Sequence, residues 1–122
     1  MQRALSTTAL VSALGLSVAA FACGGSESAV AQPAGERLYA EKGCTSCHGR
    51  AGEGTFMGPP LRNLSAHWQR DELAKFFLDP SGYAKGQPRL AEMMKAYRMP
   101  MTPIVASEAD RLVLADHVLG MK

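Results

Sequence analysis

Two cysteines and a histidine stand close together in the chain, as Cys44-Thr45-Ser46-Cys47-His48. The two thiols are three residues apart, which on a helical turn is the spacing needed to add across the two vinyl groups of one haem. The imidazole that follows directly is then directed at the iron of the same porphyrin. This short stretch therefore predicts both covalent links and the proximal ligand of a c-type haem.

Three other uses of the cysteine pair fit the rest of the chain less well. A thiol-redox Cys-x-x-Cys opens a helix after a buried strand, and the sequence shows no alternation of strands and helices. A zinc site would need a fourth strong ligand, for which only His67 and His117 remain. A disulfide between Cys44 and Cys47 would leave a small core without support. We therefore favour haem, in the form of one covalently bound haem c.

The size of the chain fits a single domain that needs a prosthetic group. It has 122 residues, of which 47% are hydrophobic and 20% charged, as in ordinary globular proteins. We predict an export signal over 1–22, a flexible tether over 23–33 and one folded domain over 34–122. A domain this short usually needs a disulfide framework, a metal or a large cofactor. The formal net charge of +2, without a large basic patch, argues against binding to nucleic acid.

The N-terminus predicts export. Arg3 gives the first charge, and the uncharged stretch that follows, up to Gly25, is too rich in serine, threonine and glycine for a membrane span. Two cleavage sites compete. Ala20-Phe21-Ala22-Cys23 resembles a bacterial lipobox, in which Cys23 is acylated and anchors the protein to a membrane, whereas Ala29-Val30-Ala31 would direct ordinary cleavage before Gln32. We favour the lipobox, because an odd exported thiol needs a chemical explanation.

The elements that must position the Cys-x-x-Cys-His motif are short helices between loops rich in glycine and proline. Apolar spacing and capping residues predict helices over 35–42, 70–78, 90–97 and 108–119. Ser107 caps the last of these helices, and Gly120 ends it. The segment 49–61 holds too many glycines and prolines for a regular element. No segment alternates as a strand does, so the fold class is all-α.

These motifs resemble those of the small class I c-type cytochromes over residues 34–122. The segments that carry the resemblance are Gly35-Glu36-Arg37-Leu38-Tyr39, Gly43 to Gly49, Gly58-Pro59-Pro60-Leu61, Trp68 with Asp79-Pro80, and Met99-Pro100. The resemblance implies a cytochrome c-like fold, with three main helices and some short ones around one haem and with the terminal helices crossing. It also implies that the carbonyl of Pro59 accepts the imidazole proton of His48, and that Leu61 packs on the haem face.

The sixth ligand of the iron separates an electron carrier from a protein that binds oxygen or peroxide. Thioethers are available at Met57, Met93, Met94, Met99, Met101 and Met121. Met99 lies in a loop and is held extended by Pro100, as in the Met-Pro motif of the family, so we predict His48 and Met99 as the axial pair. Met101 is its rival from the same loop, and His67 is a rival from another class of ligand.

Together these features predict an exported one-electron carrier, not an enzyme, that exchanges electrons between a protein donor and a protein acceptor and has no small-molecule substrate. Two alternatives stay open. One is a haem peroxidase or gas-binding sensor with a displaceable sixth ligand, and the other is a haem subunit of a larger oxidoreductase. The segment 85–98 carries four basic residues against Glu92 alone, which indicates either a solvated helix face or a docking face for an acidic partner.

Overall fold

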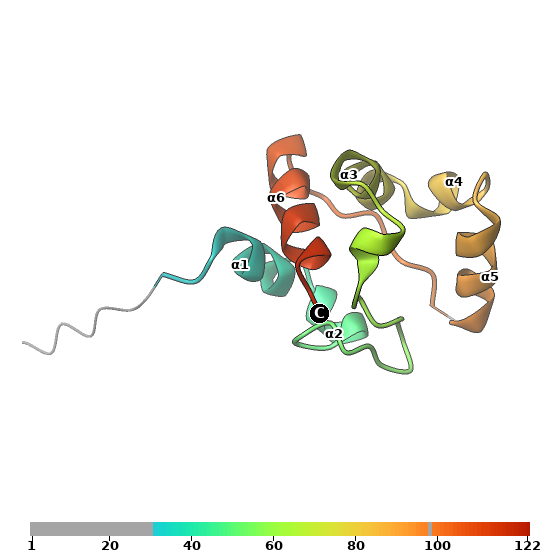
Figure 1. The fold of residues 1–122 in the computed structure, drawn as a ribbon, viewed down its shortest axis with the longest axis horizontal. Coiled ribbons are helices and arrows are strands. Elements are labelled where there is room, and N and C mark those ends of the chain that lie inside the picture. Colours follow the sequence, from blue (N-terminus) through green and yellow to red (C-terminus); the bar gives the residue numbers. More distant parts are fainter. Residues whose placement is uncertain (1–30, 98) are drawn as a thin grey trace, which may run out of the picture.

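The computed structural model describes residues 31–97 and 99–122 of the chain (Figure 1). The predicted signal, the lipobox with Cys23 and most of the predicted tether lie outside the described residues. Within them the regular elements are all helical: α1 (Ala34–Glu41), α2 (Cys44–His48), the 3-10 turn η1 (Leu64–Ala66), α3 (Arg70–Leu78), α4 (Pro80–Ala84), α5 (Pro88–Ala96) and α6 (Glu108–Leu119). This confirms the all-α prediction. Over the same residues, none of these helices has the length and hydropathy that crossing a membrane requires.

The first and last helices, α1 and α6, cross at close range (Figure 1). Gly35 makes this possible, because a Cβ added there would collide with the side chain of His117 and would lie 3.3 Å from the carbonyl oxygen of Val113. The apolar side chains of the two helices form one buried cluster at the crossing, which includes Leu38, Tyr39, Leu114, Ala115 and Val118. The helix crossing that the family resemblance implies is thus confirmed.

Helix α3 packs on α6 from the other side and carries much of the aromatic core. Its bounds are those predicted, and its N-terminus is capped by Glu72, whose carboxylate accepts a hydrogen bond from the backbone N–H of Gln69 at 3.4 Å. Arg70 pairs with Asp116 of α6 at 2.8 Å. Phe76 packs against Trp68, with ring centroids 5.1 Å apart. These contacts fix the segment around Trp68 against the body of the protein.

Two elements, η1 and α4, were not expected from the sequence. The Asp79-Pro80 pair was expected only to end a helix, and it also begins one. Asp79 Oδ1 accepts a 2.9 Å hydrogen bond from the N–H of Gly82, and Pro80 occupies the first helical position, where its missing N–H is not needed. Helix α5 likewise begins at a proline, Pro88, two residues earlier than predicted.

The C-terminal part follows the prediction closely. Ser107 Oγ accepts a hydrogen bond from the N–H of Asp110 at 3.1 Å and caps α6, which ends before Gly120. After α5, the N–H of the buried Ile104 donates a 2.8 Å hydrogen bond to the carbonyl of Phe77. Among the described helices, α5 contacts only α4. Its inner face therefore borders the candidate site instead of another helix.

Candidate functional site

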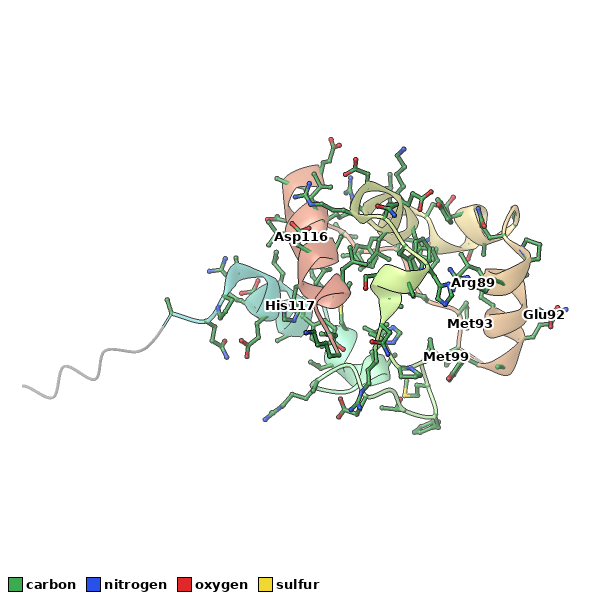
Figure 2. All side chains as sticks on the ribbon, in the orientation of Figure 1. Arg89, Glu92, Met93, Met99, Asp116 and His117 are labelled. Carbon is green, nitrogen blue, oxygen red and sulfur yellow. The ribbon has the colours of Figure 1, made fainter. Side chains whose placement is uncertain are left out.

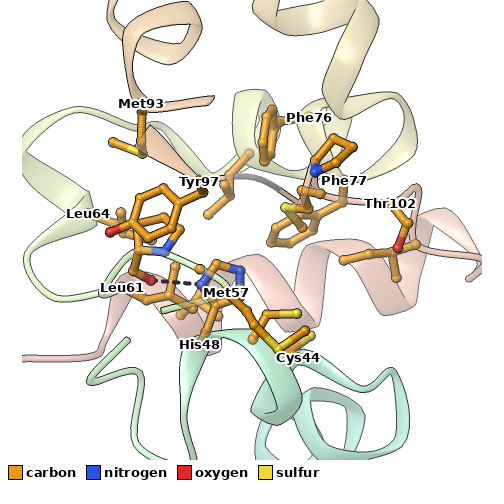
Figure 3. Close-up of a pocket in the computed structure, with 18 of the residues that line it drawn as sticks. Cys44, His48, Met57, Leu61, Leu64, Phe76, Phe77, Met93, Tyr97 and Thr102 are labelled. Atoms are coloured by element: carbon orange, nitrogen blue, oxygen red, sulfur yellow. Dashed lines mark hydrogen bonds between the residues drawn. The ribbon is translucent and has the colours of Figure 1, made fainter. Parts of the chain in front are cut away.

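Helix α2 is a short turn that presents both cysteines and His48 to one cavity (Figure 3). Cys44 and Cys47 are free thiols, each half-buried. Burial raises the pKa of the Cys44 thiol, and the neighbouring Cys47 adds to the effect. Both thiols therefore lie unpaired on one helical turn at the wall of the cavity, as attachment to a porphyrin requires.

His48 is buried, and its ring orientation is fixed by Pro59. The Nδ1 atom lies 2.7 Å from the carbonyl oxygen of Pro59, which can only accept a hydrogen bond. Nδ1 therefore carries the proton, and Nε2 keeps its lone pair for an incoming metal ion. The other two histidines lie elsewhere: His67 faces a neighbouring recess, and His117 packs against Tyr39 with ring centroids 5.6 Å apart.

The irregular segment 49–61 holds the Pro59 carbonyl in place, and it has no regular element, as predicted. The N–H of Gly54 donates to the carbonyl of His48 at 2.7 Å, and the N–H of Leu61 donates to the carbonyl of Gly52 at 2.8 Å. These two bonds fold the segment back over α2. Leu61 is thereby brought, half-buried, to the cavity wall beside His48.

The cavity has a volume of about 240 Å³ and a largely apolar lining. Its walls come from nearly every element, and they include Leu61, Leu64, Trp68, Leu73, Phe76, Phe77, Leu90, Ile104, Leu114 and Val118. Such a lining suits a large apolar ring and excludes water from it. Two thiols, one oriented imidazole and apolar walls are together the donor set and surroundings that a covalent haem needs.

Five methionines line the cavity: Met57, Met93, Met94, Met99 and Met101. Met121 instead lies against Gly52, outside the cavity lining. Met99 is 59% exposed, so it reaches the cavity from the surface, whereas Met101 is half-buried and packs against the core. The structure thus brings the thiols, His48 and Pro59 into one cluster and leaves the exposed Met99 (labelled in Figure 2) at the edge of the cavity.

A family model described as cytochrome c matches residues 33–122. The chain belongs to the cytochrome c family. Comparison with curated proteins and with solved structures finds no match. The cofactor of this cytochrome is a covalently bound haem c, its function is electron transfer, and its partners are redox proteins.

A polar recess of about 160 Å³ adjoins the cavity of the cytochrome and shares Trp68 and Leu90 with it. Its other lining residues are His67, Glu72, Tyr83, Gln87 and Arg89. The guanidinium carbon of Arg89 lies 5.5 Å from the centre of the Trp68 ring. In Figure 2 Arg89 lies on the side of α5 that faces the body of the cytochrome, opposite Glu92. Arg89 and Tyr83 could hold the carboxylates of the haem at this end of the cavity.

Sequence reasoning missed this recess, because its residues come from the segment after η1, from α3 and α4 and from the start of α5, and only Trp68 among them belongs to a motif. The described part of the basic segment, 85–97, also has more structure than its composition indicates, whereas Arg98 lies outside the described residues. Lys95 pairs with Glu92 at 2.6 Å, and Arg89 turns toward Trp68. Lys85, at the end of α4, is exposed.

Proposed function

We propose that this cytochrome is a one-electron carrier whose iron is held by His48 and Met99. The observation that carries the proposal is the hydrogen bond between His48 and Pro59 beside two free thiols in an apolar cavity. That arrangement prepares one axial ligand and both covalent links on a single helical turn. Met99 is supported by its place in the lining of the same cavity and by the proline that follows it.

A bound haem supplies an iron centre that gains and loses one electron. The residues of the chain control this centre. Pro59 fixes the orientation of the His48 ring and raises its basicity by accepting the Nδ1 proton. A thioether on the other side favours the reduced state, so Met99 raises the midpoint potential. The apolar walls around Leu61 and Phe77 exclude water and stabilise the less charged form.

The experiment that tests this proposal is a visible spectrum of the holoprotein during a redox titration. We expect low-spin bands in both oxidation states and a thioether-to-iron band in the oxidised protein. A high-spin spectrum and ready binding of CO to the reduced protein would contradict the His48 and Met99 pair.

The exposure of Met99 favours one second candidate. A ligand that is 59% exposed is held by few contacts, as a gas-binding sensor or haem peroxidase with a displaceable sixth ligand would require. The same titration separates the two, because a displaced Met99 leaves no thioether band. A haem subunit of a larger oxidoreductase would keep the band, and gel filtration of detergent-extracted native membranes would show it in a larger assembly.

We further propose that the protein works outside the cytoplasm and exchanges electrons between a donor and an acceptor protein there. The uncharged N-terminal stretch and the lipobox-like Ala20-Phe21-Ala22-Cys23 support export and a lipid anchor at Cys23. The residues between Cys23 and α1 would then be the tether that lets the domain reach its partners.

A further inference from the structure

The four residues 55–58 form a tight turn that is fixed to α2. Thr55 Oγ1 donates a 2.6 Å hydrogen bond to the carbonyl of Cys47, and it accepts one from the N–H of Met57 at 3.0 Å. The N–H of Thr55 donates to the carbonyl of Gly58 at 2.9 Å. A Cβ added at Gly58 would lie 2.9 Å from the Cys47 carbonyl oxygen, so glycine lets the turn lie directly on α2. The turn is therefore positioned by a residue that carries one of the two thiols.

Phe56 lies within this turn and points away from the core. Its side chain is 90% exposed, although the next residue, Met57, is half-buried and lines the cavity. An aromatic ring on a fixed backbone loses little conformational entropy when a partner covers it, since it has only two side-chain torsions. Phenylalanine is one of the aromatic residues that are enriched at the centre of protein–protein interfaces.

We propose that Phe56 is the anchor by which a redox partner protein docks on this cytochrome, its ring entering an apolar recess of the partner. The inference rests on the proposed carrier function. A partner seated on Phe56 lies next to Cys47, whose sulfur is one covalent link to the haem. In each encounter one electron passes between the metal centre of the partner and the iron, so that one is oxidised as the other is reduced, and no bond forms or breaks.

The size of this contact fits a transient protein partner. Covering one phenylalanine removes about 200 Å² of surface from water, whereas stable interfaces bury about 1,200 Å² or more. A second copy of this chain held on Phe56 alone would therefore dissociate. A short-lived complex is what an electron carrier needs, because it must leave one partner before it meets the next.

The charges near α2 indicate which charges the partner should carry around its apolar recess. The segments that flank the helix carry three exposed cations, Lys42, Arg50 and Arg62. Two acidic residues stand among them: Glu41, which pairs with Arg37 at 3.6 Å, and Glu53, whose pKa is lowered by backbone N–H groups and to a smaller extent by Arg62. The local balance stays positive, so a partner with carboxylates around its apolar recess fits this surface.

Phe56→Ser tests the inference, and Val105→Ser is the matched control, because it keeps the backbone carbonyl of Val105 to which Lys42 Nζ donates a 2.8 Å hydrogen bond and so leaves the cations near α2 unchanged. Val105 is 88% exposed, so both substitutions remove an apolar side chain that is already in water. The probes are membranes of the source organism, which reduce or oxidise the holoprotein through a protein partner, and ferricyanide, which needs no docking recess. We expect Phe56→Ser to lower the second-order rate with membranes about tenfold. Val105→Ser should leave that rate unchanged, and both variants should keep the wild-type ferricyanide rate and midpoint potential.

Three results would overturn the inference. The first is equal rates with membranes for the Phe56 and Val105 variants, and the second is an equal loss of rate with ferricyanide. The third is a wild-type dimer in analytical ultracentrifugation that Phe56→Ser converts to monomer, because it would assign the ring to a second copy. A wild-type protein that ferricyanide oxidises but that membranes neither reduce nor oxidise would instead contradict the carrier function itself.

Discussion

The hydroxyl of Tyr39 donates a 2.7 Å hydrogen bond to the carbonyl of Gly49, the residue that directly follows His48. This bond joins α1 to the end of α2 inside the core, where Tyr39 is fully buried. Burial is the main reason that the pKa of Tyr39 is raised to about 12, and the nearby Cys44 and Glu53 contribute.

The first prediction concerns alkaline stability. The stabilisation from the neutral Tyr39 phenol is complete below its ordinary pKa of 10.0, and it is lost as the pH rises toward about 12. Tyr39→Phe should lower the free energy of unfolding by about 1 kcal/mol at pH 8, and it should flatten the decline above pH 10. Denaturant unfolding of the holoprotein, followed by the fluorescence of its single tryptophan, measures both effects. A variant whose stability falls with pH in parallel to the wild type would contradict this role.

The second prediction concerns attachment of the haem. Cys44→Ser or Cys47→Ser should sharply reduce the yield of stable holoprotein, because each removes one covalent link. The double variant should be unfolded or degraded, since the cavity walls would face each other across an empty core. Haem staining of denaturing gels and circular dichroism are the measurements. A stable and fully folded apoprotein from the double variant would show that the haem is not part of the core.

The third prediction concerns the sixth ligand. Met99→Ala should abolish the thioether-to-iron band, lower the midpoint potential and open the iron to CO. Met101→Ala should keep the band and reduce only stability, because Met101 packs against the core. The reverse outcome would place the ligand two residues later. If both variants keep the band, the ligand is another of the methionines that line the cavity.

The fourth prediction concerns the polar recess. Arg89→Gln should lower the midpoint potential, because the haem loses a nearby cation that favours the reduced state. It should also increase the dependence of the potential on pH between pH 5 and 8, because a haem carboxylate without Arg89 has a higher pKa. Lys85→Gln removes the same charge from an exposed position at the end of α4 and serves as the control. Equal potentials in the two variants would mean that Arg89 only packs on Trp68.

The fifth prediction concerns the N-terminus. If Cys23 is acylated, the native protein should partition with membranes, and Cys23→Ala should release it as a soluble holoprotein. Partition in detergent and N-terminal sequencing are the measurements. A mature chain that begins at Gln32 would rule out the lipid anchor.

The parts that could be predicted from the sequence are those whose signal is local. Helix α3 was predicted with its correct bounds because its apolar residues recur at helical spacing, and α6 because Ser107 and Gly120 mark its ends. The two thiols and His48 lie within five consecutive residues, so their spacing alone predicts their chemistry. Helix α4 was missed because Asp79-Pro80 can both end one helix and begin another.

The rest depends on contacts that form only in the folded chain. Arg89 meets Trp68 across the recess although Arg89 belongs to no motif and lies far from Trp68 in the sequence. The sequence predicts a methionine ligand in the segment around Pro100, but the contrast between an exposed Met99 and a half-buried Met101 follows from how that segment lies on the core. Likewise, the exposure of Phe56 depends on the hydrogen bonds that fix its turn to Cys47.

The hydrogen bond between Ile104 and Phe77 divides the region after α5 into two parts with different freedom to vary. Before Ile104, the described residues Tyr97 and 99–103 lie between two fixed points, the end of α5 and the middle of the core. Neither of these points is held by a methionine, so the segment between them can be replaced without disturbing either. Under the proposed ligation by Met99, segments of other lengths or with other ligands grafted between these points would change the potential of the haem, while the crossed helices and the attachment turn keep their places.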